Sequence, residues 1–319
     1  MLARLTAVFA AALALALAAG ALAPAGAAGP PRVVGIVTGE EGGAYAEMAV
    51  AIESGLAAAS SGLSVIRVPV PAGRDGALQA RGADLIVAVG SRAARAALAT
   101  EHGLPVIATL IPHGAFERLV REHPGPAAGR RITAVFMDQP LRRQLDLVRR
   151  ALPGRQRIGV VLGPDSEQQG PMLADLAADY GFRLALERIR SGPELMPALQ
   201  RVLQESDVLL AVPDPLVFSS ETVQSVLLTS YRHRTPMVGF SPSYVKAGAL
   251  LAVSSSPGQL ASQVTEILLR MEKGEALPPP QYPRYFSVHA NGHVARSLGL
   301  RLEPEEALEQ WLKRPEARP

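Results

Sequence analysis

The sequence has 319 residues, with 32 Lys and Arg against 29 Asp and Glu, and it contains no cysteine. The lack of cysteine excludes a disulfide framework, a lipid-modified cysteine and zinc sites built on thiolates. The net charge of +3 is close to neutral, which argues against nucleic acid as a partner. Aromatic residues make up 4% of the chain, so few side chains could stack on a ligand.

The first residues have the pattern of a secretory signal peptide. Arg4 is followed by a continuous apolar run over residues 5–22 and by the A-x-A cleavage signal at Ala25, Gly26 and Ala27. A membrane anchor is the alternative, because the run is close to spanning length, but the small residues after it favour cleavage. We therefore expect a signal peptide over residues 1–28. The rest of the chain should work in the periplasm, and without cysteine it is not a lipoprotein.

Strand-like and helix-like patterns then alternate along the chain, which is typical of βαβ units with a parallel sheet. The first round is expected to contain strands at 32–38, 63–69, 83–89, 105–110 and 132–137 and helices at 44–60 and 91–101. The second round is expected to contain helices at 141–152, 172–180, 194–205 and 222–233 and strands at 157–162, 182–188, 208–212 and 237–240. Two similar rounds predict two similar lobes.

The last part of the chain is expected to hold a strand at 250–253, a helix at 257–273, an extended return at 281–289 and two closing helices at 291–298 and 304–313. Three prolines at 278–280 force extended backbone and suit a passage between the lobes.

The stretch from Asp207 to Pro257 repeats one unit three times. Each unit is an apolar run of strand length, VLLAV, PMVGF or ALLAV, that ends in proline or small polar residues. Such runs predict buried parallel strands. In open α/β sheets, small ligands bind at the loops that follow the carboxyl ends of the strands. The stretch therefore predicts part of a ligand site.

The order of FMDQPLRRQLDLVRRALPGRQRIGVVLGPDS, DVLLAVPDPLVF and TPMVGFSPSYVKAGALLAVSSSPGQLASQ resembles the periplasmic substrate-binding proteins of ABC transporters. Within them it is similar to the family that includes tryptophan-binding-type components. The resemblance implies the α/β fold of type I periplasmic binding proteins, in which two Rossmann-like lobes with parallel sheets are joined by three crossovers and hold a ligand in the cleft. It also implies an ABC permease in the inner membrane as partner. We expect a monomer.

On that template the N-terminal lobe comprises residues 32–139 and 250–273, and the C-terminal lobe comprises residues 140–249 and 280–319. The crossovers would fall near residues 138–141, near residues 247–251 and at the three prolines.

Candidate ligand contacts in the N-terminal lobe lie at strand ends. Ser91 opens a helix, whose first N–H groups can receive a carboxylate or another anion. Thr38 and Tyr45 flank a glycine-rich loop. Asp138 and Gln139 end the strand that leads into the first crossover. Each has a structural alternative, and Asp138 could instead cap a helix that starts with Pro140.

Candidate contacts in the C-terminal lobe follow its strands in the same way. Asp165 and Ser166 lie in the loop after strand 157–162, and Ser241 and Tyr244 follow strand 237–240. Asp214 stands between two prolines, so we expect a rigidly presented carboxylate that could pair with a ligand ammonium. Turn and capping roles are the alternatives for each. Carboxylate capture near Ser91 and ammonium capture near Asp214 would together suit an amino acid.

The sequence offers no catalytic constellation, so we expect neither an enzyme nor a cofactor. His289 and His293 have the spacing of metal ligands, but Asn291 and Gly292 interrupt any helix there, and no metal site is expected. The main hypothesis is a solute-binding component that captures a small polar ligand between two closing lobes. The alternative is a periplasmic sensor or an accessory protein of an envelope uptake system that uses the same fold without a dedicated permease.

Overall fold

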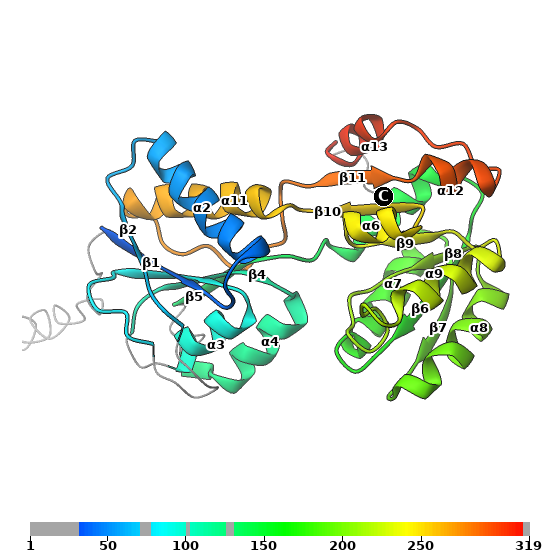
Figure 1. Ribbon diagram of the computed structural model, residues 1–319, viewed down its shortest axis with the longest axis horizontal. Helices are drawn as coiled ribbons and strands as arrows, with labels where there is room; N and C mark the ends of the chain where they lie inside the picture. The colour runs from blue at the N-terminus through cyan, green and yellow to red at the C-terminus, as the bar shows by residue number, and fades with distance from the viewer. Residues whose placement is uncertain (1–31, 71–77, 100–102, 126–130, 315–319) are drawn as a thin grey trace, which may run out of the picture.

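The computed structural model describes residues 32–70, 78–99, 103–125 and 131–314, and the predicted signal peptide lies outside these ranges. The described chain forms two lobes that lie side by side (Figure 1), each built around its own sheet. Within these ranges no helix combines the length and the hydropathy that a membrane span requires.

The first lobe contains a parallel five-stranded sheet in the order β2-β1-β3-β4-β5. Its strands are β1 (Val33–Thr38), β2 (Ser64–Arg67), β3 (Leu85–Val89), β4 (Val106–Ile111) and β5 (Ile132–Phe136). Helices α2 (Gly43–Ala58) and α11 (Pro257–Glu272) cover one face, and α3 (Ser91–Ala99) and α4 (His113–Glu122) cover the other. Because helices cover both faces, the central strands are mostly apolar, and β3 is apolar throughout with its buried LIVAV.

The second lobe contains a six-stranded sheet in the order β11-β10-β9-β8-β6-β7, in which only β11 is antiparallel to its neighbour. Its strands are β6 (Arg157–Leu162), β7 (Arg183–Arg188), β8 (Val208–Leu210), β9 (Met237–Gly239), β10 (Leu251–Ser254) and β11 (Ser287–Ala290).

Two groups of helices enclose this second sheet. One face is packed by α6 (Leu141–Ala151), α7 (Gly170–Asp179), α12 (Gly292–Ser297) and α13 (Glu305–Leu312). The other is packed by α8 (Leu195–Glu205), α9 (Val223–Arg232) and α10 (Pro242–Ala247). Each lobe thus has one core on each face of its sheet, and the predicted α/β fold of two lobes with parallel sheets is confirmed.

The predicted lobe boundaries are wrong at two of the three crossovers. Strand β10 pairs with β9 and β11, so residues 250–254 belong to the second sheet, and the chain crosses after Ser254. On the return, Gln281 forms a bridge with Val135 at the edge of the first sheet, so the chain crosses back after residue 281 and not at the prolines. In both places backbone hydrogen bonds to a neighbouring strand hold the segment in its lobe.

Candidate functional site: the cavity between the lobes

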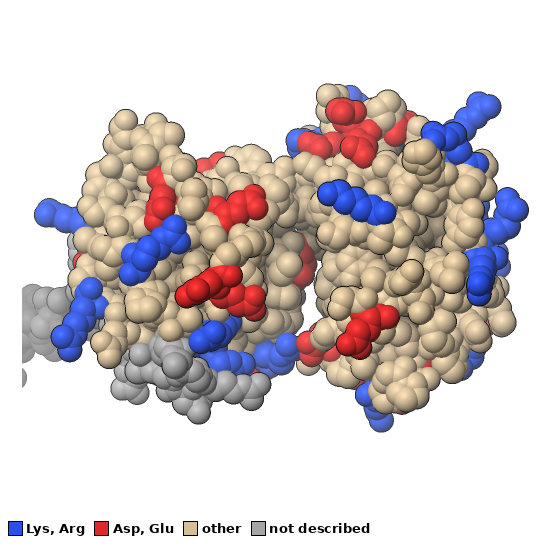
Figure 2. Space-filling view, viewed as in Figure 1, with Lys and Arg blue, Asp and Glu red and all other residues tan. Residues whose placement is uncertain are grey.

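A cavity of about 260 Å³ lies between the two lobes. The first lobe contributes the start of α4 and the segment after β5, and the second lobe contributes the loops after β6, β8 and β9. The lining residues are Pro112, Gly114, Ala115, Arg118, Asp138, Asp165, Gln169, Pro213, Asp214, Pro215, Phe218 and Phe240. Figure 2 shows the groove between the lobes, with acidic atoms on its wall and basic and acidic atoms meeting at its lower edge.

Asp138 provides a partly buried carboxylate at this cavity. It follows β5, and Oδ2 accepts a hydrogen bond from the backbone N–H of His113, the first residue of α4. Burial raises the pKa of Asp138, and the bond from His113 offsets this only in part. Asp138 therefore caps α4, not the helix after Pro140 as the alternative interpretation had it. Its charge is left undercompensated, which favours a nearby cation.

Helix α4 begins at the same point. Its N-cap is Pro112, which makes no side-chain capping bond. The first turn of a helix leaves N–H groups without intrahelical acceptors, and the helix dipole adds positive potential there. Gly114 and Ala115 of this turn line the cavity. Helix α4 is not predicted from the sequence, so this end of the site has no counterpart among the predicted residues.

Asp214 lies 3% exposed at the boundary of the cavity and holds two loops together. Its Oδ2 accepts hydrogen bonds from the backbone N–H of Asp165 (3.0 Å) and from both N–H (2.9 Å) and Oγ (2.9 Å) of Ser166. Its Oδ1 accepts from the N–H of Leu216 at 2.9 Å. This geometry does not favour the expected pairing with a ligand ammonium, because the carboxylate already serves four internal donors.

The residues around Asp214 leave space for its carboxylate and bind it. A Cβ on Gly163 would lie 2.3 Å from Asp214 Oδ1, so only glycine leaves room for the carboxylate. Ser166 is fully buried behind Asp214, and its Oγ also lies 3.0 Å from the N–H of Gly163. Asp165 itself is exposed, and its side chain faces the first lobe, where its Oδ1 lies 3.4 Å from Nη1 of Arg118.

Aromatic rings form the apolar wall of the cavity in the second lobe. Phe218 and Phe240 line it, with ring centroids 5.9 Å apart in an edge-to-face arrangement. Tyr244 packs behind both, at 6.1 Å from Phe218 and 4.6 Å from Phe240, and its hydroxyl donates to the carbonyl of Phe218. Burial raises the pKa of Tyr244. Phe240 was not predicted, although it ends the apolar run PMVGF.

Besides Ser166 and Tyr244, five predicted residues do not line the cavity. Thr38 ends β1, and Ser91 begins α3 shortly after β3. Tyr45 lies in the first turn of α2, and its ring fills the space that a Cβ on Gly90 would need. Burial, followed by the charge of Glu40, raises the pKa of Tyr45.

The other two are Gln139 and Ser241. Gln139 is 4% exposed in the first crossover, and Ser241 is the N-cap residue of α10. Of the predicted set, Asp138, Asp165 and Asp214 are those brought together at the cavity, with Ser166 and Tyr244 directly behind its wall.

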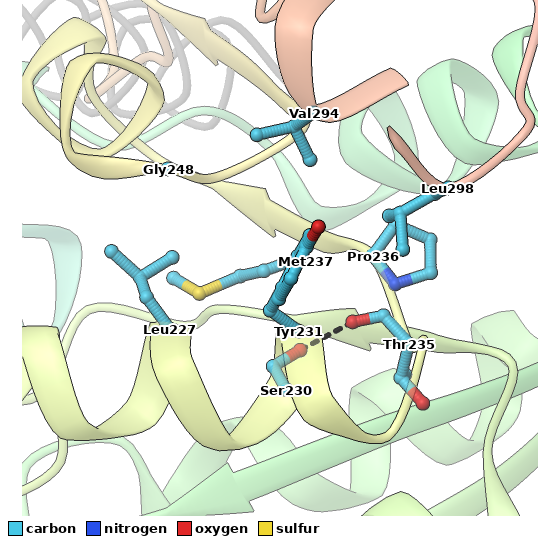
Figure 3. A pocket seen from close by; sticks show the side chains of 9 residues that line it. All are labelled: Leu227, Ser230, Tyr231, Thr235, Pro236, Met237, Gly248, Val294 and Leu298. Carbon is cyan, nitrogen blue, oxygen red and sulfur yellow. Dashed lines mark hydrogen bonds between the residues drawn. The ribbon is translucent and has the colours of Figure 1, made fainter. Parts of the chain in front are cut away.

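A second, much smaller void of about 10 Å³ lies in the second lobe between α9 and α12 (Figure 3). It is lined by side chains such as Leu227, Met237 and Val294, and Ser230 Oγ donates to the carbonyl of Thr235 beside it. Its size is that of about one water molecule, so it cannot hold a ligand. Within the described ranges, no cluster of three or more His, Cys, Asp or Glu residues could hold a metal ion.

Two lobes with parallel sheets, joined by three crossovers around a cavity lined by polar and apolar residues, define a binding protein of the periplasmic type. The model of the ABC transporter substrate binding protein family matches residues 76–302, which is more than half of the chain, and the chain belongs to this family. It is thus a ligand-binding component of the ABC transporter class, and proteins of this class are generally extracytoplasmic. Among curated proteins, none matches the sequence.

Solved structures with the same fold come from several bacteria. A conserved domain protein from Vibrio cholerae O1 biovar El Tor is 21% identical, with 88% of this chain and 97% of that chain covered and a TM-score of 0.60. An ABC domain in complex with L-Trp from Streptococcus pneumoniae is 20% identical, with 87% and 97% covered and a TM-score of 0.60. A ligand-free, open substrate-binding protein with adhesive properties from Clostridium difficile is 17% identical, with 86% and 97% covered and a TM-score of 0.64. At these identities the likeness shows the fold alone.

Proposed function

We propose that the protein captures a free α-amino acid with an apolar side chain in the cavity between its lobes and delivers it, in the periplasm, to an ABC permease of the inner membrane. The observation that carries this proposal is the position of Asp138 beside the start of α4. A carboxylate and a helix N-terminus at one place offer partners for an ammonium and a carboxylate that belong to the same small molecule.

The ammonium group of the ligand would pair with Asp138. Burial raises the pKa of this carboxyl, so its charged form is short of compensation, and a cation would supply it. The cavity as a whole has the matching electrostatics, because three aspartates and one arginine line it. A ligand with a net negative charge would be repelled, whereas a zwitterion can offer its positive end to the aspartates.

The carboxylate group would accept hydrogen bonds from the first turn of α4. Gly114 and Ala115 border the cavity, and a residue without a side chain at 114 lets a ligand approach the backbone closely. The apolar side chain would then extend toward Phe218 and Phe240 in the other lobe. Contacts to both lobes favour lobe closure around the ligand.

The cavity size agrees with a ligand of this class. Its volume of about 260 Å³ lies just below the range of roughly 300–1,000 Å³ that holds drug-sized molecules. The L-Trp bound in the similar structure from Streptococcus pneumoniae is an α-amino acid with a large apolar side chain, which supports the same chemical class here.

The proposal is tested by isothermal titration calorimetry of the purified chain against the twenty common amino acids, with ribose and glucose as ligands of another class. We expect binding of one or more apolar amino acids and none of the sugars. Asp138→Asn should weaken that binding at least about tenfold, because a charge-assisted hydrogen bond is lost.

The matched control is Asp175→Asn, at an exposed position on α7 away from the cavity, which should leave the affinity unchanged. Binding of a sugar with no response to any amino acid would overturn the proposal. If the wild type and Asp138→Asn bind the amino acid with equal affinity, Asp138 does not contact the ligand.

A further inference from the structure

Arg118 of the first lobe and Asp165 of the second lobe meet at the mouth of the cavity. Nη1 of Arg118 lies 3.4 Å from Oδ1 of Asp165, and both residues line the cavity. At the same place the backbones approach each other, because a Cβ on Gly114 would lie 3.5 Å from the carbonyl oxygen of Asp165. Helix α4 and the loop after β6 therefore approach each other across the cleft, with the ion pair as their contact.

We propose that this ion pair is a latch between the lobes, which stabilises the closed arrangement of the chain even when the cavity is empty. Three features of its surroundings support this role. They are the rigid mounting of both partners, the charge balance at the mouth, and the contrast with the neighbouring ion pairs on α4.

Both partners are mounted on fixed elements. The backbone of Asp165 is held by its N–H bond to Asp214, whose carboxylate also binds Ser166. The start of α4 is held by Asp138 through the N–H of His113. An ion pair between preorganised elements loses less conformational entropy when it forms than a pair between two mobile loops does.

The charge balance also depends on Arg118. Among the described residues that line the cavity, Arg118 is the one basic residue, against Asp138, Asp165 and Asp214. Closing the lobes brings Asp165 toward the segment that carries Asp138. Without Arg118 that approach would bring like charges together, so the arginine both attracts Asp165 and screens this repulsion.

Other pairs of the same helix do not cross the cleft. Arg121 pairs with Glu117 on α4 at 3.9 Å, and Arg95 of α3 pairs with Glu122 at 2.5 Å, both within the first lobe. These pairs cannot change the relation between the lobes. Arg121 is therefore a matched control for Arg118, since it is an exposed arginine of the same helix with a carboxylate partner.

The expected effect is modest and measurable. Exposed ion pairs contribute little to folding stability, and their measured range corresponds to a change of about one and a half- to five-fold in an equilibrium constant. A change of this size in the closure equilibrium alters the ratio of closed to open form by the same factor. Salt should weaken the pair, because both side chains are partly exposed.

The test measures the distance between the lobes in the full, ligand-free chain. The natural sequence contains no cysteine, so Ala99→Cys on α3 and Ala178→Cys on α7, both at exposed positions, accept one spin label in each lobe. Double electron–electron resonance then gives the fractions of closed and open forms. We expect Arg118→Gln and Asp165→Asn each to lower the ratio of closed to open form about one and a half- to five-fold.

Two further variants make the result specific. The exchange Arg118→Asp with Asp165→Arg should restore the closed fraction, and Gly114→Leu should open the lobes without changing any charge, because its side chain would meet the loop of Asp165. Arg121→Gln should have no effect.

The proposal is overturned if Arg118→Gln and Asp165→Asn leave the distances unchanged, or if their effects simply add and the exchange restores nothing. It is also overturned if the closed fraction of the wild type does not fall between low and high salt. The measurement needs no ligand, so it stands apart from the proposed binding of amino acids. Circular dichroism melting of each variant verifies that a change in distance is not unfolding.

Discussion

Gln139 Nε2 donates a hydrogen bond of 2.8 Å to Ser255 Oγ, and through this bond the first and second crossovers between the lobes are tied together. Ser255 Oγ in turn donates to the carbonyl of Tyr285 at 2.6 Å, in the third crossover. Arg143 donates from Nη1 both to Gln139 Oε1 and to the carbonyl of Pro283 at 2.9 Å. All three passages thus share one network, and Gln139 is at its centre.

Replacing Gln139 should therefore loosen the hinge. Gln139→Leu removes the bonds to Ser255 and Arg143 in a position that is 4% exposed, and it should lower the free energy of unfolding by about 1–3 kcal/mol. The spread of distances between the lobes should also widen. Urea unfolding measures the first effect, and the spin-labelled chain described above measures the second.

The control for this prediction is Gln204→Leu on the exposed side of α8, which should change the free energy of unfolding by less than about 0.5 kcal/mol. If the two leucine variants unfold at the same urea concentration, the network around Gln139 contributes nothing measurable to stability.

Asp138→Asn should make the chain more stable at neutral pH. Burial raises the folded-state pKa of Asp138 above its unfolded value, so the folded state binds the proton more tightly. Stability then falls as the pH rises from the unfolded pKa through the folded pKa, and the charged carboxylate remains a cost above that window. Asparagine avoids the charge and can still accept the N–H of His113.

Thermal melting checks this prediction at two pH values. The variant should melt higher than the wild type at pH 7, and the difference should disappear below the ordinary pKa of aspartate, where both proteins are neutral at this position. A lower melting temperature of Asp138→Asn at pH 7 would contradict the assignment. If the carboxylate of Asp138 binds a ligand ammonium at a cost to folding stability, Asp138→Asn should be both more stable and weaker in amino-acid binding.

Most of the fold could be predicted from the sequence. Buried parallel strands are continuous apolar runs, and the helices that cover the sheets have one polar face each. Helix α4 could not. Proline and glycine at its start, Pro112 and Gly114, favour a loop in sequence terms, and its apolar side chains Phe116 and Leu119 form too short a pattern. The crossover after β10 was misplaced because an ALLAV run suits a central strand of either sheet.

The site was predicted in part for a related reason. Polar residues at strand ends are visible in the sequence, and three of them do meet at the cavity. Their partners are not visible, because they come from distant segments. Asp214 takes its donors from Asp165 and Ser166, and Asp138 caps a helix that begins 25 residues before it. The sequence does not distinguish a strand-end carboxylate that faces a ligand from one that accepts hydrogen bonds from its own chain.

Asp214 should behave as a structural residue. Asp214→Ala leaves the N–H groups of Asp165, Ser166 and Leu216 without their acceptor, so we expect a loss of about 3 kcal/mol or more in the free energy of unfolding. Gly163→Ala should act on the same group, because its Cβ would lie 2.3 Å from Asp214 Oδ1. Urea unfolding measures both.

Because both changes act on the same group, the double variant should lose less stability than the sum of the two single losses. Gly258→Ala, in the first turn of α11, is the matched control, since the atom nearest to its Cβ is 3.8 Å away. That variant should be neutral or slightly more stable. If Asp214→Ala is almost as stable as the wild type, the structural role is contradicted, and a ligand contact is the remaining interpretation of Asp214.

Tyr282 should report on the charge of Asp138. Burial, followed by the charges of Asp138 and Glu117, raises the pKa of Tyr282 to about 12, and its ring lies 5.5 Å from that of His113. Ultraviolet titration should therefore show a tyrosine that ionises late and that is missing in Tyr282→Phe. In Asp138→Asn the pKa of Tyr282 should be lower, because one of the two charges is gone.

Tyr180 is the internal control for that titration. Its pKa is also raised to about 12, but by burial and by its hydrogen bond to Asp146 in the second lobe, so Asp138→Asn should not move it.

The unfolded chain ionises its tyrosines first, so stability should fall as the pH rises from about 10 to 12, and less steeply in Tyr282→Phe than in the wild type. An unchanged titration of Tyr282 in Asp138→Asn would mean that the charge of Asp138 does not act on Tyr282, contrary to this prediction.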